Sequence, residues 1–484
     1  MMNKFKVGVV STSQLSFPGD KKAAFRKSAE KLSTLAKELD FDLYIYDRDV
    51  ITADDAYIAA KALEEEKVDF ILLQTTSFSA GFLAPIFARI KNARLGLWAI
   101  PEGSVEGAVP FNSLCGINMY SSIIGHYLKD YRVHLKWFFG DVEDPLFIDR
   151  FHITVRALSA IKKMKQSSVA LIGGIAPGFD DLYDDERNLI RLFDGIRINR
   201  LHEYDEIKRL ADGMKAEDIN ARIAAETAEA KGFTHPTAKK MMEVNARFSL
   251  AYEAFLAKYG YNAVAISCWP KFQDDYLYSV CAVVGEINDK GVVAACEGDL
   301  TSAISMLLLK YIADDTTMLM DMSAFDEKDD TVLFWHCGPA SKRFCEKNGF
   351  SLGLNYSGTP HEPHEKEVSG TGTVRDMVFD SGPFTSARLT GECDSMFLAT
   401  GSFVDYDKPS FCGSRGWAGN LKINNQPVSA LDFVNTVLVQ RFQHHFPIVK
   451  GDFSCEIEEA MAWLDLKKID VVPYKSVMQN PLWW

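Results

Sequence analysis

The sequence predicts an α/β protein with two doubly wound parallel-sheet domains, followed by a β-rich, barrel-like C-terminal domain. Over about the first 150 residues, short apolar runs alternate with amphipathic helical patterns, which is typical of a parallel sheet covered by helices. The same alternation begins again near Ser167. After about residue 340, short runs rich in Thr, Ser, Gly and Phe are separated by turns, which indicates antiparallel β structure. We therefore expect domains at residues 1–165, 166–340 and 341–484.

The first domain is predicted from short apolar strands and intervening helices. The strands are residues 5–10, 42–46, 69–74 and 94–98. Residues 21–39 carry apolar side chains at helical spacing, including Leu32 and Leu35, and residues 53–66 show a similar helical pattern. This order of elements is expected of a Rossmann-like or flavodoxin-like domain.

The second domain is predicted to start with a strand at residues 168–174 that runs into a glycine turn. A charged helical region at residues 184–231 and a buried strand at residues 263–267 follow. The glycines around Gly173 do not form the G-x-G-x-x-G pattern of dinucleotide sites, and no G-x-x-x-x-G-K-[ST] motif occurs. A nucleotide site is therefore not expected.

The C-terminal domain is predicted to contain short strands at residues 368–423 and helices at residues 433–442 and 455–464. His444 and His445 follow the first of these helices and precede an apolar run, so we expect at least one imidazole to face the interior. The alternative is a surface pair whose positive charge complements the helix dipole.

Composition excludes several classes of protein. The chain has 484 residues, with 53 Lys and Arg against 66 Asp and Glu, and a formal net charge of −13. This acidic balance argues against nucleic acid or an anionic membrane as the main partner, because either requires a dense basic surface. No apolar run is long enough to span a membrane and no signal-peptide pattern is present, so we expect a soluble, cytoplasmic protein. The 9 cysteines include no C-x-x-C pair, which gives no support for a disulfide framework or a zinc knuckle.

Three side chains that can bind metal follow predicted buried strands: Glu297, Asp321 and His336. The strands are residues 292–296, 317–320 and 331–335, and a helix at residues 300–312 follows the first. If these strands are neighbours in one sheet, the three side chains converge at its carboxyl edge, where open α/β sheets bind ligands. Two carboxylates that lie close together repel each other unless a proton or a cation lies between them. Carboxylates with an imidazole suit Mg²⁺ or Mn²⁺.

Each of these residues alone has a simpler interpretation. A single acidic residue at a strand end is commonly a helix N-cap or a solvated loop residue. A single histidine such as His336 is commonly a core residue whose hydrogen bonds are satisfied. The repeated arrangement favours a metal site, and these alternatives stay open.

The chain resembles the L-fucose and L-arabinose isomerases in several short motifs that occur in the same order. Residues 295–299, Ala-Cys-Glu-Gly-Asp, resemble the E-G-D segment of both enzymes, and residues 443–445 resemble the double histidine near the end of the arabinose isomerases. Four further motifs resemble the smaller fucose-isomerase-like proteins, namely residues 112–116, 266–270, 334–338 and 413–417. The resemblance extends from about Val7 to Asp452, and isomerases of this kind include enzymes that act on sulfonated sugars.

This resemblance implies a Mn²⁺-dependent aldose–ketose isomerase, with Mg²⁺ or Co²⁺ as alternative metals, assembled as trimers or hexamers. Glu297 and Asp321 match the two carboxylate ligands, which are also the expected catalytic residues, and His445 matches the imidazole ligand. His336 matches an additional ligand of the arabinose-type enzymes. The second carboxylate is Glu in the arabinose type but Asp321 here, which points to the fucose type. Three protein ligands suffice in the fucose type, so a neighbouring position for His336 is the alternative.

Substrate contacts are implied at both ends of the chain. Gln14 lies in a segment that resembles the S-Q-H segment of arabinose isomerases, and Phe78 lies in one that resembles their T-F-S segment. In such families these residues come from an adjacent subunit, which would complete the pocket. For Phe78, a role in the hydrophobic core is the alternative.

Four residues of the C-terminal region are also predicted to bind substrate. Arg388 and Arg415 are candidates for contact with a hydroxyl or an anionic substituent, with surface ion pairing as the alternative. Trp417 and His444 lie in two of the motifs named above.

The implied reaction moves a proton between C1 and C2 of an open-chain sugar through a metal-bound enediolate. Glu297 and Asp321 are expected to act as base and acid, with the assignment between them open. The expected substrate is an aldose similar to L-fucose or D-arabinose. The alternative is a sulfonated hexose, converted from sulfoquinovose to sulfofructose, whose sulfonate the two arginines would bind. A non-catalytic two-lobed sugar-binding protein and a metal-dependent hydrolase or aldolase are the alternatives of other classes.

Overall fold

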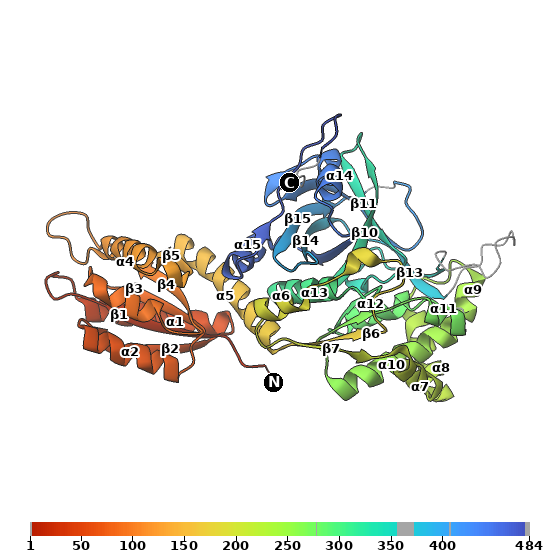
Figure 1. Ribbon diagram of the computed structural model, residues 1–484, viewed down its shortest axis with the longest axis horizontal. Coiled ribbons are helices and arrows are strands. Elements are labelled where there is room, and N and C mark those ends of the chain that lie inside the picture. The colour runs from red at the N-terminus through yellow and green to blue at the C-terminus, as the bar shows by residue number, and fades with distance from the viewer. Residues whose placement is uncertain (1, 277, 356–371, 406–407, 480–484) are drawn as a thin grey trace. The chain divides into compact units, whose positions relative to one another are not determined.

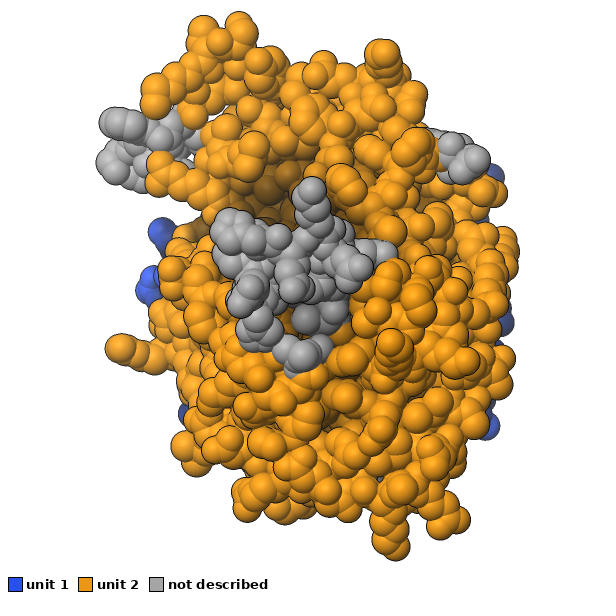
Figure 2. Space-filling view, turned by 90° about the vertical axis from the view of Figure 1, so that its right-hand side faces the viewer, with its two compact units in different colours: residues 1–162 blue, residues 163–484 orange. Residues whose placement is uncertain are grey.

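The computed structural model describes residues 2–276, 278–355, 372–405 and 408–479 (Figure 1). The chain divides into two compact units, Met1–Lys162 and Lys163–Trp484, which are coloured separately in Figure 2. Each unit has its own clusters of buried apolar side chains. Within the described ranges, no helix is both long and apolar enough to cross a membrane.

The first unit contains a five-stranded parallel sheet in the order β2-β1-β3-β4-β5, which is the flavodoxin-like order. Its strands are β1 (Lys6–Thr12), β2 (Asp42–Val50), β3 (Phe70–Thr75), β4 (Arg94–Ala99) and β5 (Leu135–Phe139). Its helices are α1 (Lys21–Glu38), α2 (Ala53–Glu65), α3 (Ala84–Ala88), α4 (Ser113–Tyr127) and α5 (Pro145–Gln166). Side chains of α2, α3 and α4 pack on one face of the sheet. Those of α1 and α5 pack on the other face, as Ser28 does against Gln74 and Phe147 against Trp98.

The second unit begins with a four-stranded parallel sheet in the order β7-β6-β8-β9. The strands are β6 (Ser168–Ile172), β7 (Arg197–His202), β8 (Ala263–Ile266) and β9 (Val293–Ala295). The helices of this part are α6 (Glu186–Leu192), α7 (Tyr204–Asp212), α8 (Ala216–Glu229), α9 (Pro236–Lys240), α10 (Met242–Tyr259), α11 (Lys271–Tyr276), α12 (Cys281–Asp289) and α13 (Leu300–Ala313). The prediction of a continuous helical region at residues 184–231 is wrong, because β7 lies within it. β7 is an edge strand with mostly polar, solvent-accessible residues, so it lacks the apolar pattern of a buried strand.

Most of the remaining strands form a β-barrel. Each strand pairs with the next in the order β16-β11-β10-β18-β14-β15, and β15 pairs with β16, so these strands form a closed ring. The ring consists of β10 (Thr317–Asp326), β11 (Thr331–His336), β14 (Gly382–Leu389), β15 (Ser395–Phe403), β16 (Ser414–Ile423) and β18 (His445–Lys450). Outside the ring lie β12 (Ser351–Leu354), β13 (Thr373–Val378), β17 (Gln426–Pro427), β19 (Lys467–Lys468), α14 (Ala430–Val439) and α15 (Ser454–Trp463). Aromatic rings such as Phe334, Phe384 and Phe446 pack edge to face in its core. The fold class predicted from the sequence is confirmed.

The expected grouping of three strand ends at one sheet edge is wrong in its geometry. β9 belongs to the parallel sheet, whereas β10 and β11 are antiparallel neighbours in the barrel. β10 continues to Asp326, so Asp321 lies in the middle of a strand rather than after its end. The barrel strands therefore begin at Thr317, before the predicted boundary at residue 341. Part of the predicted β region, residues 368–371, lies outside the described residues.

Helix α13 joins the parallel sheet to the barrel. It packs against β8 and β9 on the parallel-sheet side and against β10, β14 and β18 on the barrel side. Its side chains from Leu300 to Leu309 are all buried, including the polar ones. The loop before α13 and the adjacent ends of the barrel strands are thereby held close together, and the candidate site lies at this junction.

Candidate metal centre

Glu297 lies in a tight turn between β9 and α13. Its backbone has φ 62°, a left-handed conformation that is uncommon for a residue with a side chain, and Gly298 follows with φ 73°. A Cβ on Gly298 would lie 2.0 Å from the carbonyl oxygen of Gly174, so only glycine fits there. The Glu297 carbonyl accepts a hydrogen bond from the Ala176 N–H at 2.9 Å, and the Gly298 N–H donates to the Ile266 carbonyl at 3.0 Å. The loop after β6 and the end of β8 therefore hold this strained turn in place.

Asp299 completes the turn and is the N-cap of α13. Its carboxylate accepts the Ser302 N–H at 2.8 Å and is fully buried. It also forms an ion pair with Arg388 of β14 and lies 2.8 Å from Nδ1 of His445 at the start of β18. A capping residue of the α/β part thus orients an imidazole of the barrel.

The barrel contributes the other side chains of the cluster. Asp321 lies opposite His445 on one neighbouring strand and opposite Trp335 on the other. His445 Nε2 lies 3.3 Å from an oxygen of Glu297 and 3.7 Å from an oxygen of Asp321. Potential ligand atoms of Glu297, His444 and His445 lie within 4.8 Å of one another, as do those of Asp321, His336 and His445. His445 belongs to both groups and links them.

The residues present fit a divalent cation. Asp321 Oδ1, His336 Nε2 and His445 Nε2 are buried and form no hydrogen bond within the described residues. Since buried polar atoms are nearly always paired, three such atoms in one place indicate a bound group. Two carboxylates and an imidazole are a suitable donor set for Mn²⁺ or Mg²⁺.

Hydrogen bonding distinguishes the two buried histidines. The ionised Asp299 carboxylate only accepts hydrogen bonds, so Nδ1 of His445 donates to it, and in the neutral ring Nε2 has a free lone pair. His336 has the opposite arrangement, because its Nδ1 accepts the Cys337 N–H at 2.8 Å. The proton of neutral His336 is then on Nε2. The geometry favours His445 as a ligand and His336 as a hydrogen-bond donor.

Electrostatic effects at the site oppose the effect of burial. Burial by itself raises the pKa of Glu297, but the hydrogen bond with His444 and the nearby imidazole of His445 hold this pKa well below its usual range. Burial also raises the pKa of Asp299, and the charge of Arg388 with the His445 hydrogen bond holds it well below its usual range. For His445, burial lowers the pKa, while the hydrogen bond with Asp299 and the nearby carboxylate of Glu297 raise it to about 10. The cluster therefore stabilises a positive charge between its carboxylates.

His444 lies at the open side of the cluster. Its Nδ1 lies 2.8 Å from Asp181 and its Nε2 lies 3.3 Å from Glu297. Its ring contacts that of Phe179, with centroids 5.5 Å apart, and Phe179 contacts Trp269 in turn. The expectation that at least one imidazole of the pair faces the interior is met by His445, which is fully buried.

Arg388 lies in a buried ion pair, and its contact with substrate stays a prediction. The Arg388 side chain is 0% exposed. Its guanidinium donates to Asp299, to the hydroxyls of Thr301 and Ser302, and to the side chain of Gln443. The positive charge of Arg388 neutralises the buried carboxylate of Asp299, which would otherwise be an unpaired charge in the protein interior.

Arg415 and Trp417 lie on β16, outside the ligand cluster. Arg415 is ion-paired with Asp376, so the alternative of ion pairing describes it, and a substrate contact stays a prediction. Trp417 donates its indole N–H to the Pro409 carbonyl at 3.1 Å. It is opposite Leu333, whereas Ser414 is opposite His336. Three residues of strand separate these positions, which is about 10 Å. The structure does not bring Trp417 to the cluster.

Gln14 and Phe78 belong to the first unit and lie in adjacent loops after β1 and β3. The Gln14 N–H donates to the Ser77 hydroxyl at 2.9 Å. Phe78 is half-buried, donates its N–H to the Phe111 carbonyl and packs against Phe17. The structure brings these two segments together at the carboxyl edge of the first sheet, and their substrate contacts stay predictions.

Sequence reasoning missed two residues of the site. Asp299 is the last residue of the Ala-Cys-Glu-Gly-Asp motif, but its contacts with His445 and Arg388 depend on strands more than 80 positions away. Its position immediately before an apolar helix was a signal for an N-cap. Asp181 lies in an irregular loop with no pattern that could have indicated its contact with His444.

Comparison with known proteins places this site in a context. No family model matches the chain. A protein of Alkalicoccus urumqiensis named sulfoquinovose isomerase is 25% identical over 406 residues, which are 83% of this chain and 86% of that protein. Proteins with the same name from Priestia megaterium (strain ATCC 12872 / QMB1551) and Clostridium sp. (strain MSTE9) are 23% and 25% identical, over 84% of this chain and 86% of each relative. The part of the predicted resemblance that concerns isomerases of sulfonated sugars is therefore confirmed.

Solved structures add no argument. A solute-binding protein of Agrobacterium vitis bound with alpha-D-tagatopyranose covers 65% of this chain and 90% of its own, at 12% identity and a TM-score of 0.18. A periplasmic solute-binding protein of Actinobacillus succinogenes with bound D-allose is 17% identical, covers 64% of this chain and 93% of its own, and also has a TM-score of 0.18. Such low TM-scores indicate neither a shared fold nor a shared function.

Proposed function

We propose that this protein, an aldose–ketose isomerase like its relatives, converts sulfoquinovose to sulfofructose. The observation that carries the proposal is the convergence of Glu297, from the turn before α13, with Asp321 and His445 of the barrel. They meet around buried atoms that have no hydrogen-bond partner in the described part of the chain. The names of the relatives favour this sulfonated hexose over the aldoses similar to L-fucose or D-arabinose that the sequence first indicated.

Mn²⁺ is the proposed cofactor, with Glu297, Asp321 and His445 as its ligands. When bound, the metal supplies a Lewis acid that polarises the carbonyl of the open-chain sugar. Asp299 is not itself a proposed metal ligand. It accepts the hydrogen bond of His445 Nδ1, so that Nε2 faces the carboxylates of Glu297 and Asp321. Such carboxylate–histidine pairs fix the orientation and tautomer of metal-binding imidazoles.

The carboxylates also account for the proton transfers. Isomerisation removes a proton from C2 and returns one to C1. Either Glu297 or Asp321 can carry out these transfers, and the assignment between the two carboxylates stays open. Glu297 is already hydrogen-bonded to His444, and His444 contacts the exposed Asp181. A proton taken up by Glu297 therefore has a hydrogen-bonded route to solvent.

His336 is proposed to donate to a substrate oxygen rather than to bind the metal. Its Nε2 is buried, has no hydrogen-bond partner among the residues that the structure describes, and carries the proton in the neutral ring. Such a donor stabilises negative charge that develops on oxygen during enolisation. We therefore propose three protein ligands for the metal, with His336 as a neighbouring residue.

Arg415 is the remaining candidate for contact with the sulfonate. Its guanidinium donates to the Ser410 hydroxyl at 2.9 Å and to the Gly413 carbonyl at 2.7 Å. Both residues line a cavity beside the barrel. A sulfonate accepts hydrogen bonds in the same way as the planar or tetrahedral oxyanions that arginine commonly binds.

A substrate comparison tests the function. Protein treated with EDTA and then supplied with Mn²⁺ is incubated in D₂O with sulfoquinovose, glucose 6-phosphate or L-fucose, and products are followed by NMR. We expect sulfofructose from sulfoquinovose, with deuterium at C1, no turnover before Mn²⁺ is added, and a lower rate with L-fucose. Turnover of L-fucose but not of sulfoquinovose would contradict the proposed substrate. Full activity without metal would refute the role of the metal. Sugar binding without turnover would indicate a binding protein.

A further inference from the structure

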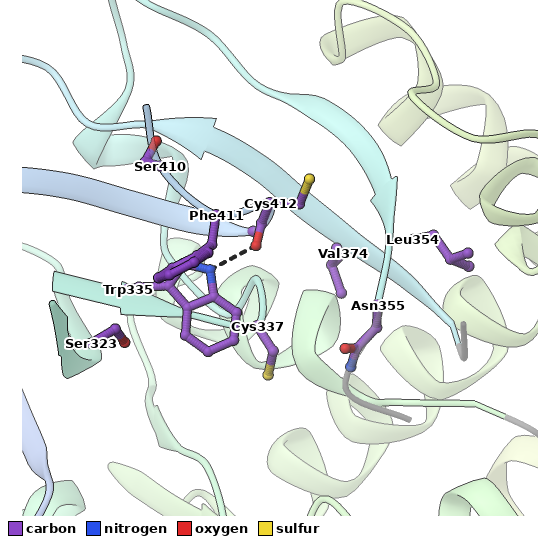
Figure 3. A pocket seen from close by; sticks show the side chains of 10 residues that line it. Ser323, Trp335, Cys337, Leu354, Asn355, Val374, Ser410, Phe411 and Cys412 are labelled. Carbon is purple, nitrogen blue, oxygen red and sulfur yellow. Dashed lines mark hydrogen bonds between the residues drawn. The ribbon is translucent and has the colours of Figure 1, made fainter. Parts of the chain in front are cut away.

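A cavity of about 590 Å³ lies next to the candidate metal centre and is not used by the proton transfers described above. Its wall combines the apolar side chains of Trp335, Phe411 and Val374 with the polar side chains of Asn355 and Ser410. In Figure 3, Trp335, Phe411 and Ser410 lie on one side, and Val374 and Asn355 lie on the other. Its volume is in the usual range for small-molecule sites. A wall with both characters suits a sugar chain, which has C–H faces as well as hydroxyl groups.

The strand register places this cavity directly beside the ligand cluster. Trp335, which lines the cavity, is the partner of Asp321 across β10 and β11. The Trp335 ring lies 6.4 Å from that of His336, and His336 lies 5.7 Å from His445, with interplanar angles of 23° and 21°. A row of nearly parallel rings therefore extends from the candidate ligand His445 to the cavity wall.

The indole of Trp335 is held in a defined orientation. Its Nε1–H donates to the Cys412 carbonyl at 2.6 Å, a bond drawn in Figure 3. The ring of Phe411 meets it edge to face, with centroids 6.4 Å apart and an angle of 84°. A half-buried aromatic side chain that is fixed in this way can bind a ligand without losing further conformational freedom.

We propose that this cavity binds the C3–C6 part of the substrate and that Trp335 is a specificity-determining residue whose ring contacts the C–H face of that chain. The inference rests on the proposed function, because it assumes that C1 and C2 lie at the ligand cluster. It adds a binding role for a residue that takes no part in the proton transfers. The expected effect is on substrate affinity, since the contact is equal in the ground state and the transition state.

Kinetics of Trp335 variants test this inference. Trp335→Leu is expected to raise KM for sulfoquinovose about tenfold, with kcat changed less than about twofold, because one aromatic contact of this size contributes roughly a factor of ten. Trp335→Phe, which keeps a ring, is expected to recover most of the affinity. Phe411→Leu is the second variant, since Phe411 is 56% exposed in a loop and its replacement leaves the barrel core intact. Phe325→Leu is the matched control, an aromatic on β10 that is 40% exposed and does not line the cavity.

The outcomes separate the inference from the function on which it rests. Absence of turnover by the wild-type protein contradicts the proposed function. If the wild type is active, unchanged KM in both Trp335→Leu and Phe411→Leu overturns the inference. An equal fall in kcat and kcat/KM, or the same effect in Phe325→Leu, also overturns it, because it indicates a disturbance of the catalytic centre or of the barrel.

Discussion

Replacing Asp299 by Asn removes the negative charge that joins Arg388 to His445. The wild-type carboxylate is fully buried, caps α13, pairs with Arg388 and accepts from Nδ1 of His445. Asn is also a good N-cap, so the helix start is preserved. The variant nevertheless leaves the buried Arg388 without a counter-charge. It also presents an amide that can donate to Nδ1 of His445, which would move the imidazole proton to Nε2.

Two separate effects follow from this geometry. Breaking a buried ion pair by removing one partner destabilises a protein by about 3–5 kcal/mol, and Arg388, at 0% exposure, has no access to water. Loss of the carboxylate that orients a metal-binding histidine lowers metal affinity by about 10–100-fold. We expect both losses in Asp299→Asn, measured by urea unfolding followed by circular dichroism and by titration calorimetry with Mn²⁺.

A double variant and a matched control make the reasoning testable. Asp299→Asn combined with Arg388→Met removes both charges and is expected to recover most of the stability, but not the Mn²⁺ affinity. Asp185→Asn is the matched control, because Asp185 is another N-cap of the same unit. Its carboxylate accepts the backbone N–H groups of Arg187 and Asn188, and neither of these bonds involves a guanidinium. This substitution should change stability by less than about 0.5 kcal/mol. A loss below about 1 kcal/mol with unchanged Mn²⁺ affinity in Asp299→Asn would refute the reasoning.

Three further predictions concern the turn, the carboxylates and the acidic groups away from the site. Glu297→Gln is expected to lower kcat at least about 100-fold while the circular dichroism spectrum stays unchanged, and an active variant would exclude Glu297 from the chemistry. Gly298→Ala should destabilise the protein more than Gly260→Ala, measured by thermal unfolding; both glycines have positive φ, but only at Gly298 does a Cβ meet backbone, 2.0 Å from a carbonyl oxygen. Equal effects of the two substitutions would contradict the role of that close approach. Burial, with the nearby charge of Glu286, raises the pKa of Glu226 from 4.5 to about 9, so the folded protein binds this proton more tightly than the unfolded chain. Its contribution to stability is present below pH 4.5 and is lost as the pH rises to about 9, so Glu226→Gln should raise Tm more at pH 9 than at pH 5, and an equal shift at both would disprove it.

The sequence predicted the parallel sheets well, because buried parallel strands have continuous apolar runs. β1, β3 and β6 have such runs and were located to within a few residues. The helices α1 and α2 were recognised from their apolar spacing. β7 was missed because an edge strand has polar side chains that resemble a surface helix.

The site was only partly predictable, for a physical reason. The residue types that converge on His445 were recognised from short motifs, but their geometry was expected at one parallel edge. Antiparallel pairing of β10 with β11 and β18 cannot be read from residues 317–336, because an apolar strand pattern does not specify its partner. The buried ion pair of Arg388 was not predictable for the same reason: nothing in β14 alone shows that Asp299, the N-cap of α13, neutralises this arginine.

Helix α13 has a consequence for protein engineering. It is shared between the parallel sheet and the barrel, and nearly every one of its side chains is enclosed. Cutting the chain near residue 315, between α13 and β10, would remove α13 from the barrel. It would also expose the apolar side chains of α13 that the barrel covers. Chimaeras that exchange substrate preference between relatives should therefore transplant Lys163–Trp484 as an indivisible block.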